Sequence, residues 1–206
     1  MSSGKSEPRG RWWSDRTDAL PLPLGCNVIR RDLDEKFPAE GIEVAVREIQ
    51  EGVVYEQDGM RITAFDVDHR PVVPALGFRI DYSGRSVVLS GDTRYSENLV
   101  SFAQGADLLV HEVIAPEAVG VRRRAAGSDD ETTRRIVGHH TTPQQAGEIF
   151  SRIGPRLAVY SHIVGGPGCD EEVLEGTRET YSGPFEIGVD LMTVVVGDTV
   201  NVERPS

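Results

Sequence analysis

The stretch Val87-Val88-Leu89-Ser90-Gly91-Asp92-Thr93-Arg94 decides how the rest of the chain is arranged. A run of β-forming residues ends abruptly in small residues, and Asp92 follows just beyond the predicted strand. In α/β proteins the sheet fixes the backbone, a glycine such as Gly91 lets the chain turn, and a polar side chain projects at the carboxyl edge. Asp92 is therefore interpreted as an acceptor in a turn, a helix N-cap or a metal ligand.

The composition is that of an ordinary globular protein. The 206 residues are enough for one domain or for one large piece of a bigger domain, with 38% hydrophobic and 27% charged residues. No apolar run approaches the roughly 20 residues that span a bilayer, and the start shows no signal-peptide pattern. We expect a cytoplasmic protein without a membrane partner. The two cysteines, Cys26 and Cys169, indicate neither a disulfide framework nor a thiolate zinc site.

The formal net charge of −11 disfavours a broad, nonspecific nucleic-acid surface, because phosphate binding needs lysine and arginine. Local basic patches remain at Arg122–Arg124 and Arg134–Arg135, although Asp129, Asp130 and Glu131 lie between them. The alternative interpretation of this charge run is a solvated, mobile loop.

Residues 1–39 are predicted to be an extended or disordered arm, because Leu20-Pro21-Leu22-Pro23-Leu24 can form neither a helix nor a central strand. Residues 40–206 are predicted to be the folded domain. Within it, apolar periodicity and turn residues predict strands at 42–49, 53–56, 60–67, 76–82, 85–89, 107–110, 157–161, 185–187, 191–196 and 200–203.

Helices are predicted after Tyr95, from Pro143 to Ile153, and around 171–181. The middle helix has the clearest start, since Thr142 is a plausible N-cap with Gln145 three residues later, as in a capping box. The stretch 116–135 is predicted to be an exposed insertion or lid, with one helical turn after Ser128.

All five histidines fall between residues 69 and 162. His69, His111 and His162 each end a predicted strand, as Asp92 does, whereas His139 and His140 precede a helix start. A lone histidine of this kind is more often structural than a ligand. A set gathered at the strand ends of one sheet offers the imidazole and carboxylate groups that zinc, iron or manganese bind.

An ordered series of motifs resembles the metallo-β-lactamase superfamily and, within it, the ribonuclease Z-like branch, which also contains phosphodiesterases and arylsulfatase-like hydrolases. The resemblance covers roughly residues 40–200 and implies an α/β fold, a metallo-β-lactamase-type αββα sandwich of which the chain carries mainly the C-terminal half. The motifs are Asp68-His69 with Pro74–Phe78, Ser90-Gly91-Asp92-Thr93, Ala106–Glu112, His140-Thr141-Thr142 with Ala146, and Tyr160-Ser161-His162.

The resemblance also implies roles for individual residues. His69 would ligate one metal ion, His162 a second, and Asp92 would bridge the two. His140 would be the catalytic histidine that protonates the leaving group or stabilises the transition state, with Glu112 orienting it. Thr93 would support these groups from behind, His111 would do the same or be purely structural, and His139 would lie at the surface. The family implies two Zn²⁺ ions, with Mn²⁺ or iron as alternatives.

The chain also departs from the family pattern. The superfamily's HxHxDH loop, which supplies most of the ligands, has no counterpart, since no histidine precedes His69. Each ion would keep one histidine and share Asp92, whereas catalytic zinc normally has three protein ligands. The first half of the sandwich is mostly missing as well, so the sequence is interpreted as a truncated or rearranged form.

Two functions are compatible with these features. The first is a metal-dependent hydrolase, impaired by the missing loop, that cleaves a small phosphodiester or sulfate ester, with transfer RNA as a further substrate. The second is a non-catalytic fragment of the fold that works by self-association or partner binding. A homodimer is expected.

Overall fold

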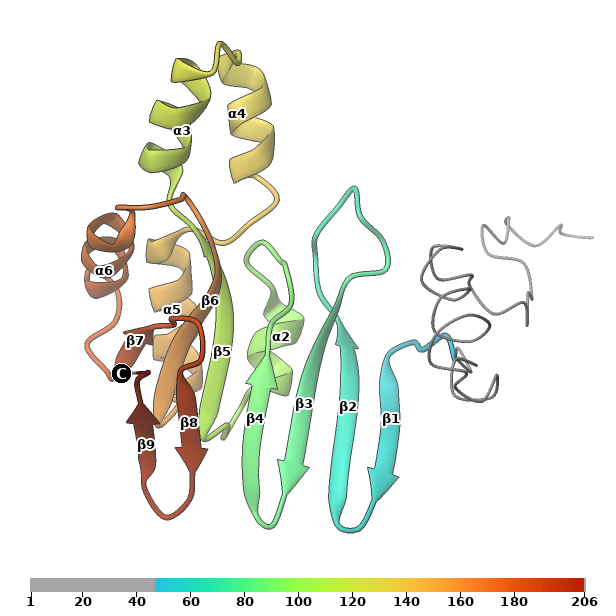
Figure 1. Cartoon of the computed structure of the whole chain (residues 1–206). Coiled ribbons are helices and arrows are strands. Elements are labelled where there is room, and N and C mark those ends of the chain that lie inside the picture. Colours follow the sequence, from blue (N-terminus) through green and yellow to red (C-terminus); the bar gives the residue numbers. More distant parts are fainter. Residues whose placement is uncertain (1–46, 206) are drawn as a thin grey trace, which may run out of the picture. The chain divides into compact units, whose positions relative to one another are not determined.

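The computed structural model describes residues 47–205, and residues 49–205 form the unit shown in colour in Figure 1. Its main feature is a seven-stranded mixed sheet in which the strands follow one another in chain order. The strands are β1 (Gly52–Gln57), β2 (Met60–Asp66), β3 (Leu76–Tyr82), β4 (Arg85–Leu89), β5 (Leu108–Ile114), β6 (Leu157–Val164) and β7 (Phe185–Ile187). A separate two-stranded sheet contains β8 (Thr193–Val196) and β9 (Val200–Glu203). The helices are α2 (Glu97–Phe102), α3 (Pro116–Ala125), α4 (Asp130–Val137), α5 (Pro143–Ile153) and α6 (Asp170–Arg178).

Strands β1 to β4 are antiparallel to one another. Tight turns join β1 to β2 and β3 to β4, as the sequence predicts, and a longer loop joins β2 to β3. Asp58 and Gly59 both have positive φ angles, 51° and 78°, and so do Ser83 and Gly84, 49° and 72°. Two consecutive residues with positive φ are typical of the tight turns whose twist matches that of paired strands. From β4 onward the sheet is parallel, which requires the crossover helices that follow each strand.

The central strands are covered on both faces. On one face, α2, α5 and α6 pack with the sheet around the buried side chains of Phe65, Leu99, Phe150 and Tyr160. On the other, β8 and β9 pack over Leu108, Leu157 and Val159. This double cover explains why β6 begins as a continuous apolar run, as the sequence predicts.

The strands differ from the sequence-based expectations in three places. Arg47–Ile49 are not in a strand, and the rest of the strand predicted at 42–49 lies outside the described residues, as do the arm at 1–39 and its boundary. The strand predicted to end at His111 continues to Ile114, and the one predicted to end at His162 continues to Val164. The reason is tertiary, because β5 and β6 go on pairing through Val113 and Ile163.

The stretch 116–135, predicted to be largely irregular, forms most of a helical hairpin composed of α3 and α4. Pro116 occupies the first turn of α3, and Asp129 caps α4 by accepting a hydrogen bond from the Thr132 backbone N–H. These local start signals outweigh a composition rich in small and charged residues. Among the helices of residues 47–205, none has the length and apolar character needed to cross a bilayer.

Candidate active site at the carboxyl edge of the sheet

Five side chains singled out from the sequence lie at one edge of the sheet. Strands β2, β4, β5 and β6 run in the same direction, so the segments that follow or end them meet at the upper edge in Figure 1. These residues are His69 after β2, Asp92 after β4, Glu112 in β5, His140 between α4 and α5, and His162 in β6.

Asp92 is directed by the turn that precedes it. Gly91 has a φ of 62°, and a Cβ atom there would lie 2.5 Å from the backbone oxygen of Leu76, so only glycine fits. The N-cap alternative for Asp92 is wrong, because Ser96 caps α2. The Asp92 carboxylate instead lies 3.4 Å from Nε2 of His162 (Oδ2 to Nε2) and is 43% exposed.

His162 sits on an irregularity of β6. His111 pairs with Tyr160 and Val113 with Ile163, so β6 has one more residue than β5 across this interval. His162 takes a positive φ of 49°, which is uncommon for a residue with a Cβ atom. A bulge of this kind re-aims a side chain, and here it leaves the imidazole beside Asp92.

Glu112 and His140 form the most tightly held pair of the site. The Glu112 side chain is 2% exposed and accepts a hydrogen bond from the Thr141 backbone N–H at 2.7 Å. Its second oxygen lies 3.0 Å from Nδ1 of His140. This hydrogen bond raises the pKa of His140, with a smaller electrostatic contribution from Asp92, while burial of the ring acts in the opposite direction. The pair therefore holds a proton on Nδ1 and leaves Nε2 for chemistry.

The His140 ring also contacts the other histidines of the site. Its centroid lies 5.1 Å from that of His69 and 5.8 Å from that of His162. Nδ1 of His69 is 2.9 Å from the backbone oxygen of His139, so His139 contributes its carbonyl group. Three imidazoles and one carboxylate are thereby brought together from four separate segments.

Thr93 stabilises this edge of the sheet through hydrogen bonds to two neighbouring segments. It is fully buried, and its hydroxyl accepts a hydrogen bond from the Asp68 backbone N–H while its carbonyl accepts one from the Thr141 hydroxyl. These bonds tie the segments that carry His69, Asp92 and His140. The supporting role expected of Thr93 toward the metal ligands stays a prediction.

Sequence reasoning missed two groups at this edge. Asp68 forms ion pairs with Arg70 and Arg94, and the hydrogen bonds from Arg70 lower the pKa of Asp68 to about 2. Ser90 accepts a hydrogen bond from the Glu112 backbone N–H at 3.0 Å and so joins β4 to β5. The sequence signal that could have pointed to these two residues is their position next to His69 and Asp92.

A pocket of about 230 Å³ lies beside His69 and is lined by residues 66–70 and 72–75.

His111 is placed differently from the other histidines. It lies inside β5, fully buried, with its ring 5.8 Å from that of Phe150 on the helical face of the sheet. Its Nδ1 is 2.6 Å from the Glu112 carbonyl oxygen, and burial lowers the pKa of His111. His111 therefore packs in the core behind Glu112, away from the exposed edge.

The donors at this edge suit a divalent metal ion in kind but do not make a complete site. Imidazole nitrogens and a carboxylate oxygen are the ligands that zinc takes. Within residues 47–205, however, no three His, Cys, Asp or Glu side chains are arranged closely enough to share one ion. Asp92 and His162 form a donor pair, and His140 already uses Nδ1 toward Glu112.

Comparisons with known proteins agree with the motifs. A family model described as a beta-lactamase superfamily domain matches residues 20–163. The chain is 33% identical to the ribonuclease Z of Mycobacterium avium (strain 104), over 90% of this chain and 71% of that protein. It is 36% identical to a putative ribonuclease Z of Mycobacterium tuberculosis (strain CDC 1551 / Oshkosh), over 74% of this chain and 66% of the relative.

Among solved structures, the metallo-beta-lactamase fold protein YhfI from Bacillus subtilis superposes on 65% of this chain and 48% of its own, with a TM-score of 0.49 and 21% identity. The chain spans between about half and seven tenths of the length of the curated relatives that it matches. The family and fold class predicted from the motifs are confirmed. The chain belongs to the metallo-β-lactamase superfamily and, within it, to the ribonuclease Z-like hydrolases.

Proposed function

We propose that this chain hydrolyses phosphodiester bonds in RNA, as an endoribonuclease-type hydrolase. The observation that carries the proposal is the Glu112–His140 pair, which is largely buried and lies beside His69, Asp92 and His162 at one edge of the sheet. A histidine fixed in this way is suited to donate a proton to a leaving oxygen.

His140 is proposed as the general acid and Glu112 as its positioning residue. Because Glu112 accepts the hydrogen bond from Nδ1, the remaining ring nitrogen, Nε2, carries the transferable proton. The hydrogen bond to Glu112 raises the pKa of His140 and so favours its protonated form, which is the form that a general acid needs. Glu112 itself is 2% exposed and acts through His140.

His69, Asp92 and His162 are proposed as the protein's contribution to a divalent-metal site. Ligand type favours Zn²⁺, two ions being the expectation for the family, with Mn²⁺ or iron as alternatives. The geometry of residues 47–205 does not complete such a site. Water, other parts of the chain or a partner chain would have to supply the missing ligands.

RNA is proposed as the substrate because the relatives bear the name ribonuclease Z. A transfer RNA precursor is the specific candidate. The preference for a small phosphodiester or sulfate ester, drawn from the acidic composition, has no support from these relatives. A small phosphodiester nevertheless undergoes the same bond cleavage and serves as an assay substrate. The predicted homodimer stays a prediction, which sedimentation at micromolar concentration would check.

Hydrolysis of bis(p-nitrophenyl) phosphate and cleavage of a transfer RNA precursor, each with Zn²⁺ or Mn²⁺ added, test the proposal. Asp92→Ala and His140→Ala should each reduce both activities to background. Asp198→Asn is the matched control, and this variant should keep wild-type rates. Asp198 lies in the turn between β8 and β9, away from the active site, and is a fully exposed carboxylate that pairs with Arg85. Activity that survives Asp92→Ala, or a wild-type chain without either activity, would overturn the proposal.

A further inference from the structure

The helical hairpin of α3 and α4, residues 116–137, rises from the same edge of the sheet as the candidate active site (Figure 1). Helix α3 begins two residues after β5, the strand that carries Glu112. At the other end, the backbone N–H of His140 donates to the carbonyl of Val137, the last residue of α4, at 3.3 Å. Both ends of the hairpin are therefore fixed beside the Glu112–His140 pair.

The hairpin differs from most of the described chain in how its arginines are partnered, although Arg178 in α6 also forms no ion pair and lies over the Phe185 ring instead. Eight arginines elsewhere in residues 47–205 form ion pairs with carboxylates, and these are Arg61, Arg70, Arg79, Arg85, Arg94, Arg152, Arg156 and Arg204. Within the same residues, no ion pair is formed by the arginines of the hairpin, which are Arg122, Arg123, Arg124, Arg134 and Arg135. Their charges are thus available to a ligand.

Three of these arginines are exposed, and their guanidinium groups do not anchor the hairpin to the rest of the described fold. Arg122 is different, because it donates to the Gly165 carbonyl at 2.9 Å and anchors the hairpin to the loop after β6. Arg124, Arg134 and Arg135 are exposed, and among residues 47–205 their guanidinium groups make a single hydrogen bond, from Arg135 to the Thr132 hydroxyl. We call Arg124, Arg134 and Arg135 the hairpin cations.

The carboxylates of the hairpin offset these cations only in part. Asp129 is engaged as the cap of α4 and accepts hydrogen bonds from the backbone N–H and the hydroxyl of Thr132. Asp130 and Glu131 each lie one helical turn before Arg134 and Arg135, close enough to weaken their field, but no ion pair joins them among the described residues. Arg134 and Arg135 lie in the last turn of α4, toward His140. The hairpin carries five arginines against four carboxylates in a chain whose net charge is −11.

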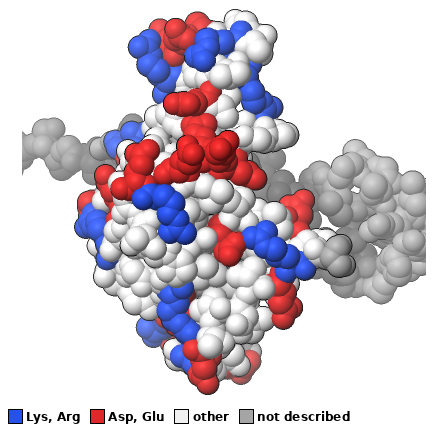
Figure 2. Space-filling view, turned by 90° about the vertical axis from the view of Figure 1, so that its left-hand side faces the viewer, with Lys and Arg blue, Asp and Glu red and all other residues white. Residues whose placement is uncertain are grey.

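On the face shown in Figure 2, the surface at the base of the hairpin is acidic, which disfavours binding of an anionic ligand there. Figure 2 shows acidic side chains gathered at its base. One groove there is lined by Glu117, by Glu171, Glu172 and Glu175 of α6, and by its C-cap residue Glu179. Basic side chains stand above them on the hairpin, with a smaller group of acidic side chains at its tip. A polyanion would be repelled from the α6 side and attracted to the projecting helices.

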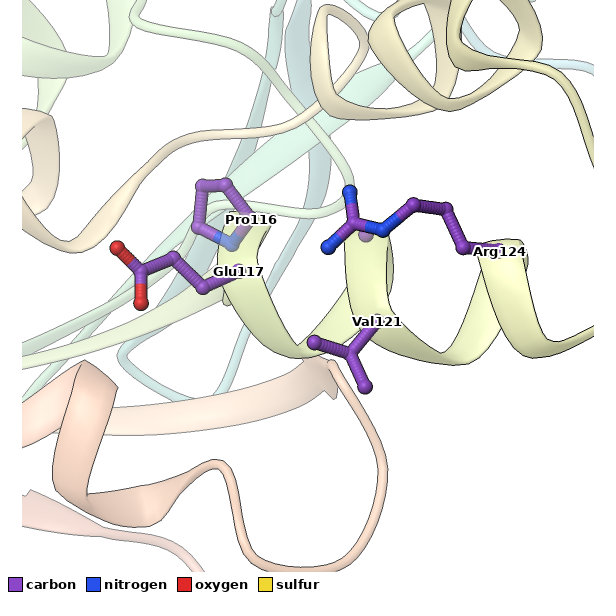
Figure 3. Close-up of a pocket in the computed structure, with 5 residues that line it drawn as sticks. Pro116, Glu117, Val121 and Arg124 are labelled. Carbon is purple, nitrogen blue, oxygen red and sulfur yellow. The ribbon is translucent and has the colours of Figure 1, made fainter.

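A groove along α3 adds a second feature that suits a nucleotide. It has a volume of about 460 Å³ and is lined by Pro116, Glu117, Gly120, Val121 and Arg124 (Figure 3). The Arg124 guanidinium lies close to Gly120, where a Cβ atom would be 3.3 Å from Nη1. Val121 is 60% exposed, so a cation and an apolar surface lie side by side, matching the phosphate and the base of a nucleotide.

We propose that the hairpin cations bind the sugar–phosphate backbone of an RNA strand next to the bond that the active site cleaves. This inference rests on the proposed function, since it names where that substrate is held. Guanidinium groups pair with phosphate through two parallel hydrogen bonds, and the attachment of α4 to His140 places these contacts beside the reacting group. An acidic polypeptide is the alternative ligand, which the test distinguishes.

The test is equilibrium binding of a fluorescein-labelled RNA, a transfer RNA precursor, to the full chain in the presence of EDTA, followed by fluorescence anisotropy. The variant is R124Q/R134Q/R135Q. The matched control is R61Q/R85Q/R204Q, which removes the same charge from exposed arginines that pair with Glu56, Asp198 and Glu186. Circular dichroism checks that both variants are folded.

The proposal predicts at least a tenfold higher Kd for R124Q/R134Q/R135Q at about 0.1 M salt, with the control within about twofold of wild type. The slope of log K against log salt should become shallower by about 2, since each single-strand phosphate contact contributes about 0.7. Equal weakening in both variants, no measurable binding by the wild-type chain, or displacement of the RNA by polyglutamate at equal charge concentration would overturn it.

Failure of the proposed function gives a different pattern. Binding in EDTA does not depend on hydrolysis, so a chain without hydrolytic activity can still show the loss of binding. Conversely, hydrolysis that requires Asp92, together with unchanged RNA binding in R124Q/R134Q/R135Q, leaves the function standing and refutes the role of the hairpin.

Discussion

Replacing Glu112 tests the geometry of the site most directly. Its carboxylate is buried in β5 and accepts two hydrogen bonds, from the Thr141 backbone N–H at 2.7 Å and from Nδ1 of His140 at 3.0 Å. Glu112→Ala leaves both donors without an acceptor in a site that water enters poorly. Each unsatisfied buried donor costs about 1–3 kcal/mol, so the free energy of unfolding should fall by about 2–6 kcal/mol.

Glu112→Gln removes the negative charge of the side chain and keeps its shape. The amide oxygen can still accept from the Thr141 N–H, but the amide NH₂ meets Nδ1 of His140 as a second donor. The lost charge-assisted hydrogen bond should cost about 1.5–3 kcal/mol, less than the alanine variant. Glu186→Gln is the matched control, because its exposed pair with Arg204 is worth at most about 1 kcal/mol.

The cost of Glu112→Gln should depend on pH. The hydrogen bond from His140 to Glu112 raises the pKa of His140 above its ordinary value of 6.5. A histidine whose pKa is raised on folding contributes stability that is fully present below the unfolded pKa and is lost as pH rises through the folded pKa. The stability difference between wild type and Glu112→Gln should therefore be larger near pH 5.5 than near pH 9.

Urea unfolding of the metal-free protein, followed by circular dichroism at several pH values, measures this difference. A side-chain NMR titration of His140 reports its pKa in both proteins and should give a lower value in Glu112→Gln. A stability difference that is flat between pH 5.5 and 9, or an unchanged pKa of His140, would refute the assigned pairing.

Three further predictions concern the scaffold and the metal. Thr142→Ala removes the capping box with Gln145 and should lower the free energy of unfolding by about 1 kcal/mol, measured by urea denaturation; a neutral effect would contradict the cap. Tyr160→Phe removes a buried 2.7 Å hydrogen bond to the Thr177 hydroxyl and should cost about 1 kcal/mol, because Thr177 keeps its bond to a backbone carbonyl; unchanged stability would speak against that bond. The isolated chain should bind divalent metal weakly and sub-stoichiometrically, and elemental analysis showing two tightly held ions per chain would contradict this.

The sequence by itself determined the features that depend on neighbouring residues. Asp58-Gly59 and Ser83-Gly84 predicted two hairpins, because these residues tolerate the positive φ angles that the turns require. Thr142, Pro143 and Gln145 predicted the start of α5 for the same local reason, through satisfied backbone donors at a helix end. The ordered motifs identified the family, since they are spread over most of the chain.

The tertiary structure alone decided how far β5 and β6 extend and where the site residues point. Strand pairing beyond His111, the bulge that gives His162 a positive φ, and the burial of Glu112 against Thr141 all depend on segments distant in sequence. The distribution of arginine ion pairs is likewise visible only in three dimensions. The physical reason is that a turn or a cap is satisfied within a few residues, whereas strand length, burial and charge pairing are settled by whichever segments the fold places alongside.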